Sequence, residues 1–135
     1  MTGYISFTEA NIELIKKGQK IETRRVWKQA RVKVGNTYKC RITRFKKYEG
    51  DDVFITVDDV HREKLGEITH VGAVMEGCAT IGEFMKEWTQ IHKDVGWSPD
   101  TVVYTVRFHL ARIGEKDIRN PTFVGIPILD RQVSR

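Results

Sequence analysis

The sequence is poor in cysteine and proline and contains no long hydrophobic run. Its 135 residues include two cysteines and three prolines. Cys40 and Cys78 form no metal-binding or redox motif, which favours two reduced thiols over a disulfide framework. No window approaches the ~20 apolar residues that a membrane-spanning helix needs. The first residues show no basic start followed by an apolar stretch, so we expect no secretory signal, no membrane association and a cytoplasmic location.

The composition is that of one globular domain with an uneven charge. The chain is 40% hydrophobic and 30% charged, with a net charge of +5. From Lys16 to Lys47 there are 13 lysines or arginines and one acid, which gives +12, whereas the rest of the chain sums to −7. A segment this basic either binds a polyanion or forms a solvated surface. Because the positive charge lies inside the expected fold, we favour a binding site.

Two segments have the spacing and the start signals of helices. They cover residues 6–17 and 81–93. Each begins with a capping box, a hydroxyl residue followed three positions later by a glutamate; the two pairs are Ser6 with Glu9 and Thr80 with Glu83. In residues 81–93 apolar side chains recur at helical spacing, which predicts an amphipathic helix with a core-facing stripe.

Alternating apolar and polar residues predict strands between and after these helices. Residues 37–45 and 101–111 alternate most clearly, and residues 21–27 and 53–57 are shorter extended stretches. Residues 58–70 are polar and receive no assignment. Because few strand pairs leave room for a long crossover, the order favours an α+β domain with a mostly antiparallel or mixed sheet, which can curl into a small barrel.

The sequence after Arg112 differs from the rest of the chain. It contains Asn120-Pro121 and Ile126-Pro127, which interrupt regular structure. Its apolar residues are too many for a purely disordered tail. We expect residues 112–135 to form a C-terminal extension that packs as an extended arm or against a partner chain.

The segment from Gly18 to Arg25 carries the first candidate chemistry. Gly18 allows a sharp exit from the helix, and a bend at the next residues would bring Lys20 close to Thr23. A desolvated lysine can lose its proton, and a threonine hydroxyl beside such an amine can act as a nucleophile. Lys20 and Thr23 are therefore candidate catalytic residues.

The residues that follow suggest contacts to a nucleotide. Arg24 and Arg25 present forks of donors that suit phosphate or a base edge, and Trp27 could stack on a base. Lys28 and Arg41 lie in the same basic segment and are further candidate binding residues. The alternative is a surface strand with ordinary charges and one core tryptophan.

Glu76 is the second candidate. A carboxylate in a loop before a helix can act as a general acid or base. The alternative is a turn acid near a helix N-terminus, where negative charge is favoured. No metal site or cofactor is expected, because there is no P-loop, no GxGxxG motif and no HxH or HxxxH spacing among the histidines.

The pattern Gly-x-Lys-x-x-Thr-x-Arg after an N-terminal helix resembles the signature of the ASCH domain family, a branch of the PUA-like β-barrel superfamily. Further parts agree in order and spacing: Tyr4–Phe7, Glu76-Gly77, Glu83-Phe84 with Trp88, and Gly96–Asp100 followed by Val102–Leu110. The resemblance covers roughly residues 4–111. It implies a domain over residues 1–111, built as a small barrel of mixed or antiparallel strands with two or three flanking helices.

The resemblance also implies two kinds of function. The family has roles in RNA binding, RNA processing or regulation. Its bacterial N-acetylcytidine amidohydrolases use a lysine, a threonine and a glutamate, which fall here on Lys20, Thr23 and Glu76, with the branch's arginine on Arg25. This chain departs from that branch in an insertion over about residues 46–70, in its double arginine and in its tail.

Three functions remain open at this stage. The leading one is an RNA- or nucleotide-binding domain whose basic cleft favours single-stranded RNA, through Arg24, Arg25, Trp27, Lys28 and Arg41. The alternative is an amidohydrolase in which Lys20 takes the Thr23 proton, Thr23 attacks the amide carbonyl and Glu76 protonates the leaving amine. The third is a regulatory domain that binds a nucleotide-like ligand and, through the tail, a partner protein. A ribonuclease is less favoured, and the oligomeric state is left open.

Overall fold

The computed structural model describes residues 3–43, 46 and 48–117. The C-terminal extension lies outside the described residues from 118 onward. In chain order the elements are β1 (Tyr4–Ser6), α1 (Glu9–Lys16), β2 (Glu22–Arg25), β3 (Thr37–Arg41), β4 (Val53–Lys64), the 3-10 helix η1 (Leu65–Glu67), α2 (His70–Met75), α3 (Ile81–Ile91), β5 (Val102–Ile113) and β6 (Lys116–Asp117).

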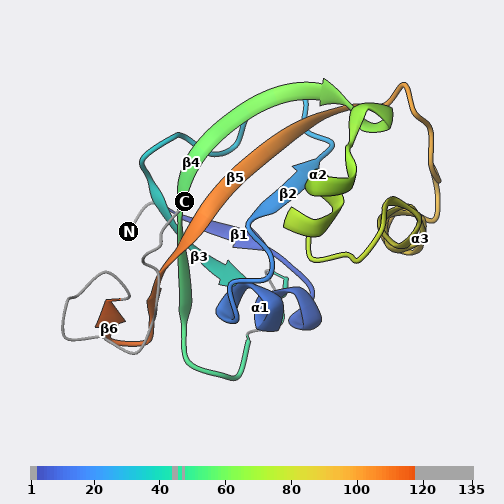
Figure 1. Cartoon of the computed structure of the whole chain (residues 1–135). Coiled ribbons are helices and arrows are strands. Elements are labelled where there is room, and N and C mark those ends of the chain that lie inside the picture. The colour runs from blue at the N-terminus through green and yellow to red at the C-terminus, as the bar shows by residue number, and fades with distance from the viewer. Residues whose placement is uncertain (1–2, 44–45, 47, 118–135) are drawn as a thin grey trace.

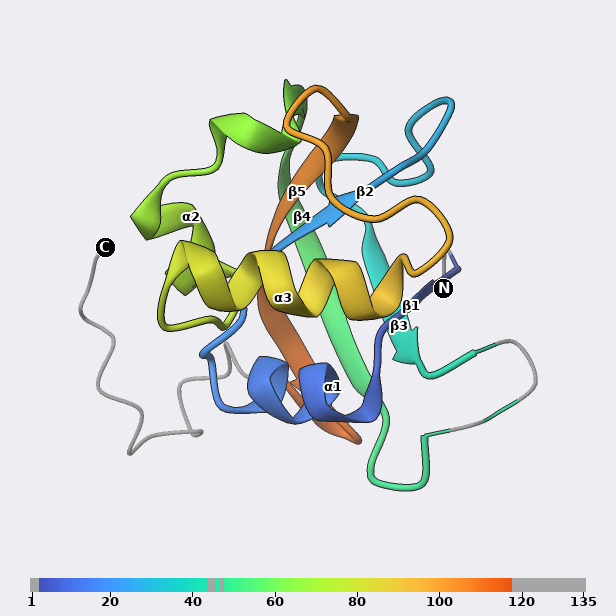
Figure 2. The same ribbon diagram turned by 90° about the vertical axis from the view of Figure 1, so that its right-hand side faces the viewer.

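The strands form one mixed sheet, as the sequence predicted. Its order is β1-β3-β4-β5-β2, and β6 pairs with β5 (Figure 1). The β1–β3 pair is parallel and the other pairs are antiparallel. The three α-helices lie on one side of the sheet (Figure 2). The α+β class is confirmed.

The barrel expected from the family resemblance is not closed. The terminal strands of the sheet path are β1 and β2, and among the described residues no strand pairing joins them. The backbone edges of β1 and β2 therefore face an opening in the sheet. The candidate residues Lys20, Thr23 and Arg25 lie at this opening.

Two details of the predicted helices were wrong. Ser6 lies in β1, and the N-cap of α1 is Thr8, whose hydroxyl accepts from the Asn11 backbone N–H at 3.1 Å. At α3, Thr80 does accept from the Glu83 N–H at 3.0 Å. The Glu83 carboxylate, however, accepts from the Ala79 N–H at 2.9 Å, one residue earlier than a capping box requires.

The unassigned stretch 58–70 holds three pieces of structure. Strand β4 does not stop at residue 57 but runs to Lys64, where it pairs with the first half of β5. The polar residues from Asp58 onward lie mainly on the exposed part of this long strand. The sequence there shows no alternation of apolar and polar residues, so the strand could not be predicted. Helix η1 follows, and then α2, whose cap is Thr69 accepting from the Gly72 N–H at 3.0 Å.

Two buried clusters form the core. The larger one lies between α1 and the sheet and includes Ile12, Ile15, Val106 and Phe108. The smaller one packs α2 and α3 against the ends of β4 and β5 and is made of Leu65, Ile68, Ala73, Cys78, Phe84, Trp88 and Val103. Strand β5 thus contributes to both clusters, so it is buried on more than the single face that its alternation predicted. Among the described residues, no helix is long and apolar enough to cross a membrane.

Candidate functional site

A cleft of about 340 Å³ opens between the β1 and β2 edges of the sheet. Its walls come from the β1–α1 connection, from β2, from the loop after α2 and from one face of α3. In Figure 2, α3 crosses in front of this region and α1 lies below it. Pockets that hold small organic ligands have volumes of about 300–1,000 Å³, so the cleft has room for a nucleoside-sized molecule.

Lys20 and Glu76 form a buried ion pair in this cleft. The Lys20 ammonium donates to Glu76 Oε1 at 2.7 Å and to the Glu76 backbone carbonyl at 2.9 Å. The two side chains are only 3% and 5% exposed. The sequence prediction that Lys20 and Glu76 share a site is therefore consistent with the geometry, although they are 56 residues apart.

Two glycines with positive φ bring these residues together. Gly18, at φ +74°, ends α1 and turns the chain toward β2, and the Ile21 N–H then donates to the Met75 carbonyl at 2.7 Å. Gly77, at φ +97°, turns the chain directly after Glu76. A Cβ on Gly77 would lie 2.9 Å from Leu14 Cδ1, so the leucine side chain would have to shift, and the positive φ disfavours a side chain in any case.

Thr23 lies in the same cleft and is held by Arg25. The Arg25 Nε donates to Thr23 Oγ1 at 2.9 Å, and its Nη2 donates to the Ser6 carbonyl at 2.5 Å. Arg25 thus bridges the open edge between β2 and β1. Burial lowers the pKa of Arg25 to about 10, while the charge of Glu76 acts in the opposite direction. Among the described residues, no hydrogen bond joins Lys20 to Thr23.

Arg24 lines the cleft but is buried behind Glu76. Its Nη1 donates to Glu76 Oε2 at 3.1 Å, and its Nε donates to Glu63 Oε2 at 2.9 Å. Its Nη1 also lies 3.1 Å from Glu22 Oε1. Burial by itself raises the pKa of Glu63, but the hydrogen bond from Thr105 and the charge of Arg24 outweigh it and lower that pKa.

The other predicted binding residues lie outside the cleft. Trp27 packs against the larger core cluster, with its ring centroid 6.0 Å from that of Tyr104. Lys28 is exposed on the next position of the chain. Arg41 lies over the Tyr4 ring, 4.3 Å from its centroid, and its Nε donates to the Thr43 carbonyl at 3.0 Å.

Helix α3 contributes more to the site than its core stripe predicted. Phe84 and Trp88 are buried, as expected, but they also form the cleft wall together with Glu87, Ile91 and His92. The Trp88 and His92 rings stack with centroids 3.9 Å apart, and the Trp88 indole N–H donates to the Gly96 carbonyl at 3.3 Å. The i, i+4 spacing of Trp88 and His92 was the available signal for this arrangement.

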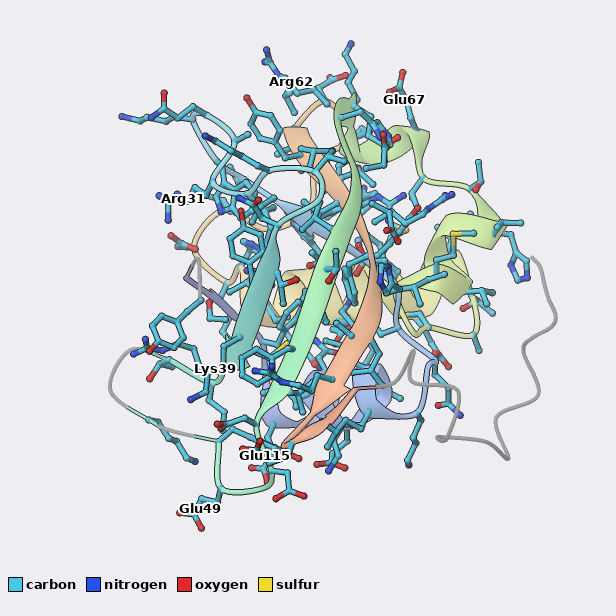
Figure 3. The ribbon with its side chains drawn as sticks, turned by 90° about the vertical axis from the view of Figure 1, so that its left-hand side faces the viewer. Arg31, Lys39, Glu49, Arg62, Glu67 and Glu115 are labelled. Carbon is cyan, nitrogen blue, oxygen red and sulfur yellow. The ribbon has the colours of Figure 1, made fainter. Side chains whose placement is uncertain are left out.

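Not all the positive charge of the basic segment is exposed. The charges of Lys20 and Arg24 are balanced inside the protein by Glu76 and Glu63. Among the residues of the segment that the structure describes, the exposed cations are Lys17, Lys28, Arg31, Lys33 and Lys46. Figure 3 shows Arg31 and Lys39 projecting outward on the β3 side of the sheet.

The remaining ionisable groups suggest neither a metal site nor a reactive thiol. No group of three or more histidine, cysteine, aspartate or glutamate side chains suited to a metal ion occurs in the described ranges. Cys40 and Cys78 are free and buried. Burial raises the pKa of each thiol to about 12.

Comparison with solved structures identifies the fold. The crystal structure of an ASCH domain from Lactobacillus crispatus JV V101 matches with a TM-score of 0.57 at 13% identity, over 80% of this chain and 78% of that one. The chain has the fold of an ASCH domain. Protein EF3133 from Enterococcus faecalis V583, which carries the family label DUF984, matches with a TM-score of 0.53 at 15% identity, over 75% of this chain and 66% of that one. No family sequence model and no curated protein matches the chain.

Proposed function

We propose that the protein binds a nucleoside, or the unstacked base of a single-stranded RNA, in the cleft beside α3. The observation that carries this proposal is the convergence of Lys20, Thr23, Arg25 and Glu76 on one pocket of nucleoside size. These side chains offer both donors and acceptors, which a base edge requires. The ASCH fold, the resemblance to an RNA-associated family and the basic segment support the same function.

The aromatic wall supports a planar ligand. Phe84 and Trp88 form apolar surface beside the polar groups, and His92 lies at the same wall. Ligand pockets of this kind combine apolar walls with a few fixed polar groups that set orientation. A base entering between α3 and β2 would meet both.

Cations outside the cleft would hold the RNA backbone. Each phosphate that a lysine or arginine neutralises on a single strand makes log affinity fall by about 0.7 per log unit of salt. Lys28 and Arg41 lie outside the cleft and suit this role better than the buried Arg24.

The test is a salt titration of RNA binding with the full chain. Fluorescence anisotropy of a labelled single-stranded RNA, at several salt concentrations, gives the affinity and its salt slope. We expect Thr23→Val to weaken binding without changing the slope, and Lys28→Ala to lower the slope by about 0.7. Lys64→Ala, an exposed lysine outside the basic segment, is the matched control and should change neither. An affinity that is independent of salt, or no binding of any RNA, would exclude the RNA proposal.

A second candidate function is hydrolysis of the amide of an N-acetylcytidine-like nucleoside. It is favoured by one specific observation, that Lys20, Thr23 and Glu76 all line the cleft. The Thr23 oxygen would attack the amide carbonyl as its proton passes to a neutral Lys20 amine. Glu76 would protonate the leaving cytosine amine, and water would then hydrolyse the acyl-threonine ester.

This reaction needs a rearrangement of the resting site. Lys20 donates to Glu76 and Thr23 accepts from Arg25, so Lys20 must turn toward Thr23 when substrate binds. Turnover of N-acetylcytidine to cytidine, followed by chromatography, tests it. Activity that Thr23→Val and Lys20→Met both abolish would support the reaction, and no turnover at high protein concentration would leave the cleft as a binding site only.

A further inference from the structure

Arg24 is the candidate binding residue whose position differs most from its predicted role. Its side chain is only 5% exposed, so contact with an RNA phosphate would require it to leave its pocket. Instead its guanidinium lies among three carboxylates, those of Glu22, Glu63 and Glu76. Nη1 donates to Glu76 Oε2 at 3.1 Å on the cleft side, and Nε donates to Glu63 Oε2 at 2.9 Å on the other side.

The residues around Arg24 leave space for its guanidinium. Gly72 of α2 is buried, and a Cβ there would lie 2.9 Å from Arg24 Nη2. A side chain at this position would push the guanidinium out of its place. On another side, the Phe84 ring lies under Arg24, with its centroid 5.9 Å from Cζ. Helix α2 and helix α3 therefore both contact the guanidinium.

The Glu63 carboxylate is held by a residue outside the cleft. The Thr105 hydroxyl donates to Glu63 Oε2 at 2.7 Å. Glu63 and Thr105 line a smaller pocket of about 180 Å³, which also contains Arg24 but neither Lys20 nor Glu76. A continuous series of contacts thus runs from Thr105 through Glu63 and Arg24 to Glu76 and on to Lys20.

We infer that Arg24 is a positioning residue of the cleft, which holds Glu76 by Oε2 and thereby leaves Oε1 directed at Lys20. The ligand side of this inference rests on the proposed function. The planar fork of an arginine can bond two carboxylates at fixed angles, whereas the compact ammonium of a lysine cannot reproduce that geometry. Ligand affinity in the cleft should therefore depend on Glu63 and Thr105, although neither lines it.

The test uses the full chain with Arg24→Lys, Arg24→Met, Glu63→Gln and Thr105→Val. One readout needs no ligand: the NMR chemical shift of the Glu76 side-chain carbon Cδ. The other is the Kd for cytidine. Asp52→Asn is the matched control, because Asp52 pairs with Lys39 at 3.3 Å on the far part of the sheet. Thr105→Val replaces a hydroxyl by a methyl group of similar size. It can therefore be measured even if the Arg24 variants do not fold.

We expect both Arg24 variants to move the Glu76 resonance and to weaken cytidine binding about tenfold, by analogy with the loss of an outer hydrogen-bond partner of a metal ligand. Glu63→Gln and Thr105→Val should act in the same direction with smaller effects. The effects of Arg24→Met and Glu63→Gln should be less than additive in the double variant, because both act through Glu76. Asp52→Asn should change neither readout.

Two results would overturn the inference. One is a Glu76 resonance that does not respond to Glu63→Gln or Thr105→Val. The other is Arg24→Lys that binds like the wild type while Arg24→Met lowers the salt slope of RNA binding by about 0.7, as expected for a direct phosphate contact. If the wild type binds neither cytidine nor RNA, the proposed function fails, and the ligand-free Glu76 resonance still decides whether Arg24 holds Glu76.

Discussion

Replacing Lys20 by methionine should reveal how much the buried ion pair contributes to stability. Methionine keeps most of the apolar length of lysine but removes the ammonium. The variant loses the bonds to Glu76 Oε1 at 2.7 Å and to the Glu76 carbonyl at 2.9 Å. Both acceptors are atoms of Glu76, which has little access to water because it is only 4% exposed.

The expected loss in the free energy of unfolding is about 3 kcal/mol, the lower end of the cost of removing one partner of a buried pair, because Arg24 still donates to Glu76 Oε2. The surface pair of Lys39 and Asp52 sets the comparison. Its side chains are 22% and 42% exposed, so Lys39→Met should cost only about 0–1 kcal/mol. Since a domain of this kind is stable by about 5–15 kcal/mol, the Lys20 variant should still fold.

The assay is urea unfolding followed by circular dichroism, with the free energy taken from linear extrapolation. A double variant, Lys20→Met with Glu76→Met, should lose less than the sum of the two single variants, because the Lys20–Glu76 interaction that each single variant removes is lost only once. If Lys20→Met costs no more than Lys39→Met, the buried pair does not stabilise the site and the reasoning is wrong.

Three further predictions concern other parts of the molecule. Cys40 and Cys78 should react with a thiol reagent at mildly alkaline pH only after unfolding, because burial raises both thiol pKa values to about 12, and fast labelling of the native protein would contradict this. Gly72→Ala should lower the free energy of unfolding by about 1–3 kcal/mol through its 2.9 Å clash. At Gly82 of α3 the nearest atom to an added Cβ is Thr80 Oγ1 at 3.7 Å, so Gly82→Ala should raise the free energy of unfolding by about 0.5–1 kcal/mol, and equal effects of the two substitutions in urea unfolding would refute the clash. The pKa of Glu63 is lower in the folded protein than in the unfolded chain, so ionised Glu63 stabilises the fold at pH values above the unfolded pKa. This stabilisation is lost as the pH falls through the folded pKa. Between about pH 5 and pH 2 the wild type should therefore lose more stability than Glu63→Gln in acid unfolding.

Local chemistry made much of the fold predictable. The two long helices, the strands around Tyr38 and Val106 and the α+β class all follow from periodicity in the sequence. The second half of β4 was not predictable in this way, because one of its faces is exposed and its polar residues carry no alternating signal. Whether the sheet closes into a barrel could not be predicted either, because closure depends on whether β1 and β2 pair. No local sequence pattern encodes that contact.

The same limit applies to the site. Lys20, Thr23 and Arg25 lie within six residues, on β2 and just before it, so their proximity follows from the local chain, and the family resemblance pointed to Glu76. The position of Arg24 needed the tertiary structure. In a strand with charges at alternate positions, a buried arginine and an exposed one look alike, and contacts with distant carboxylates such as that of Glu63, 39 residues away, distinguish them.

An NMR titration of the full chain with cytidine tests most directly whether a nucleoside binds in the cleft between β2 and α3. We expect saturable shifts at the Thr23 and Glu76 backbone amides and at the indole N–H of Trp88, which lines the cleft. Thr23→Val should weaken the response. Shifts centred elsewhere on the molecule, or none up to the solubility limit of cytidine, would contradict the proposed binding site.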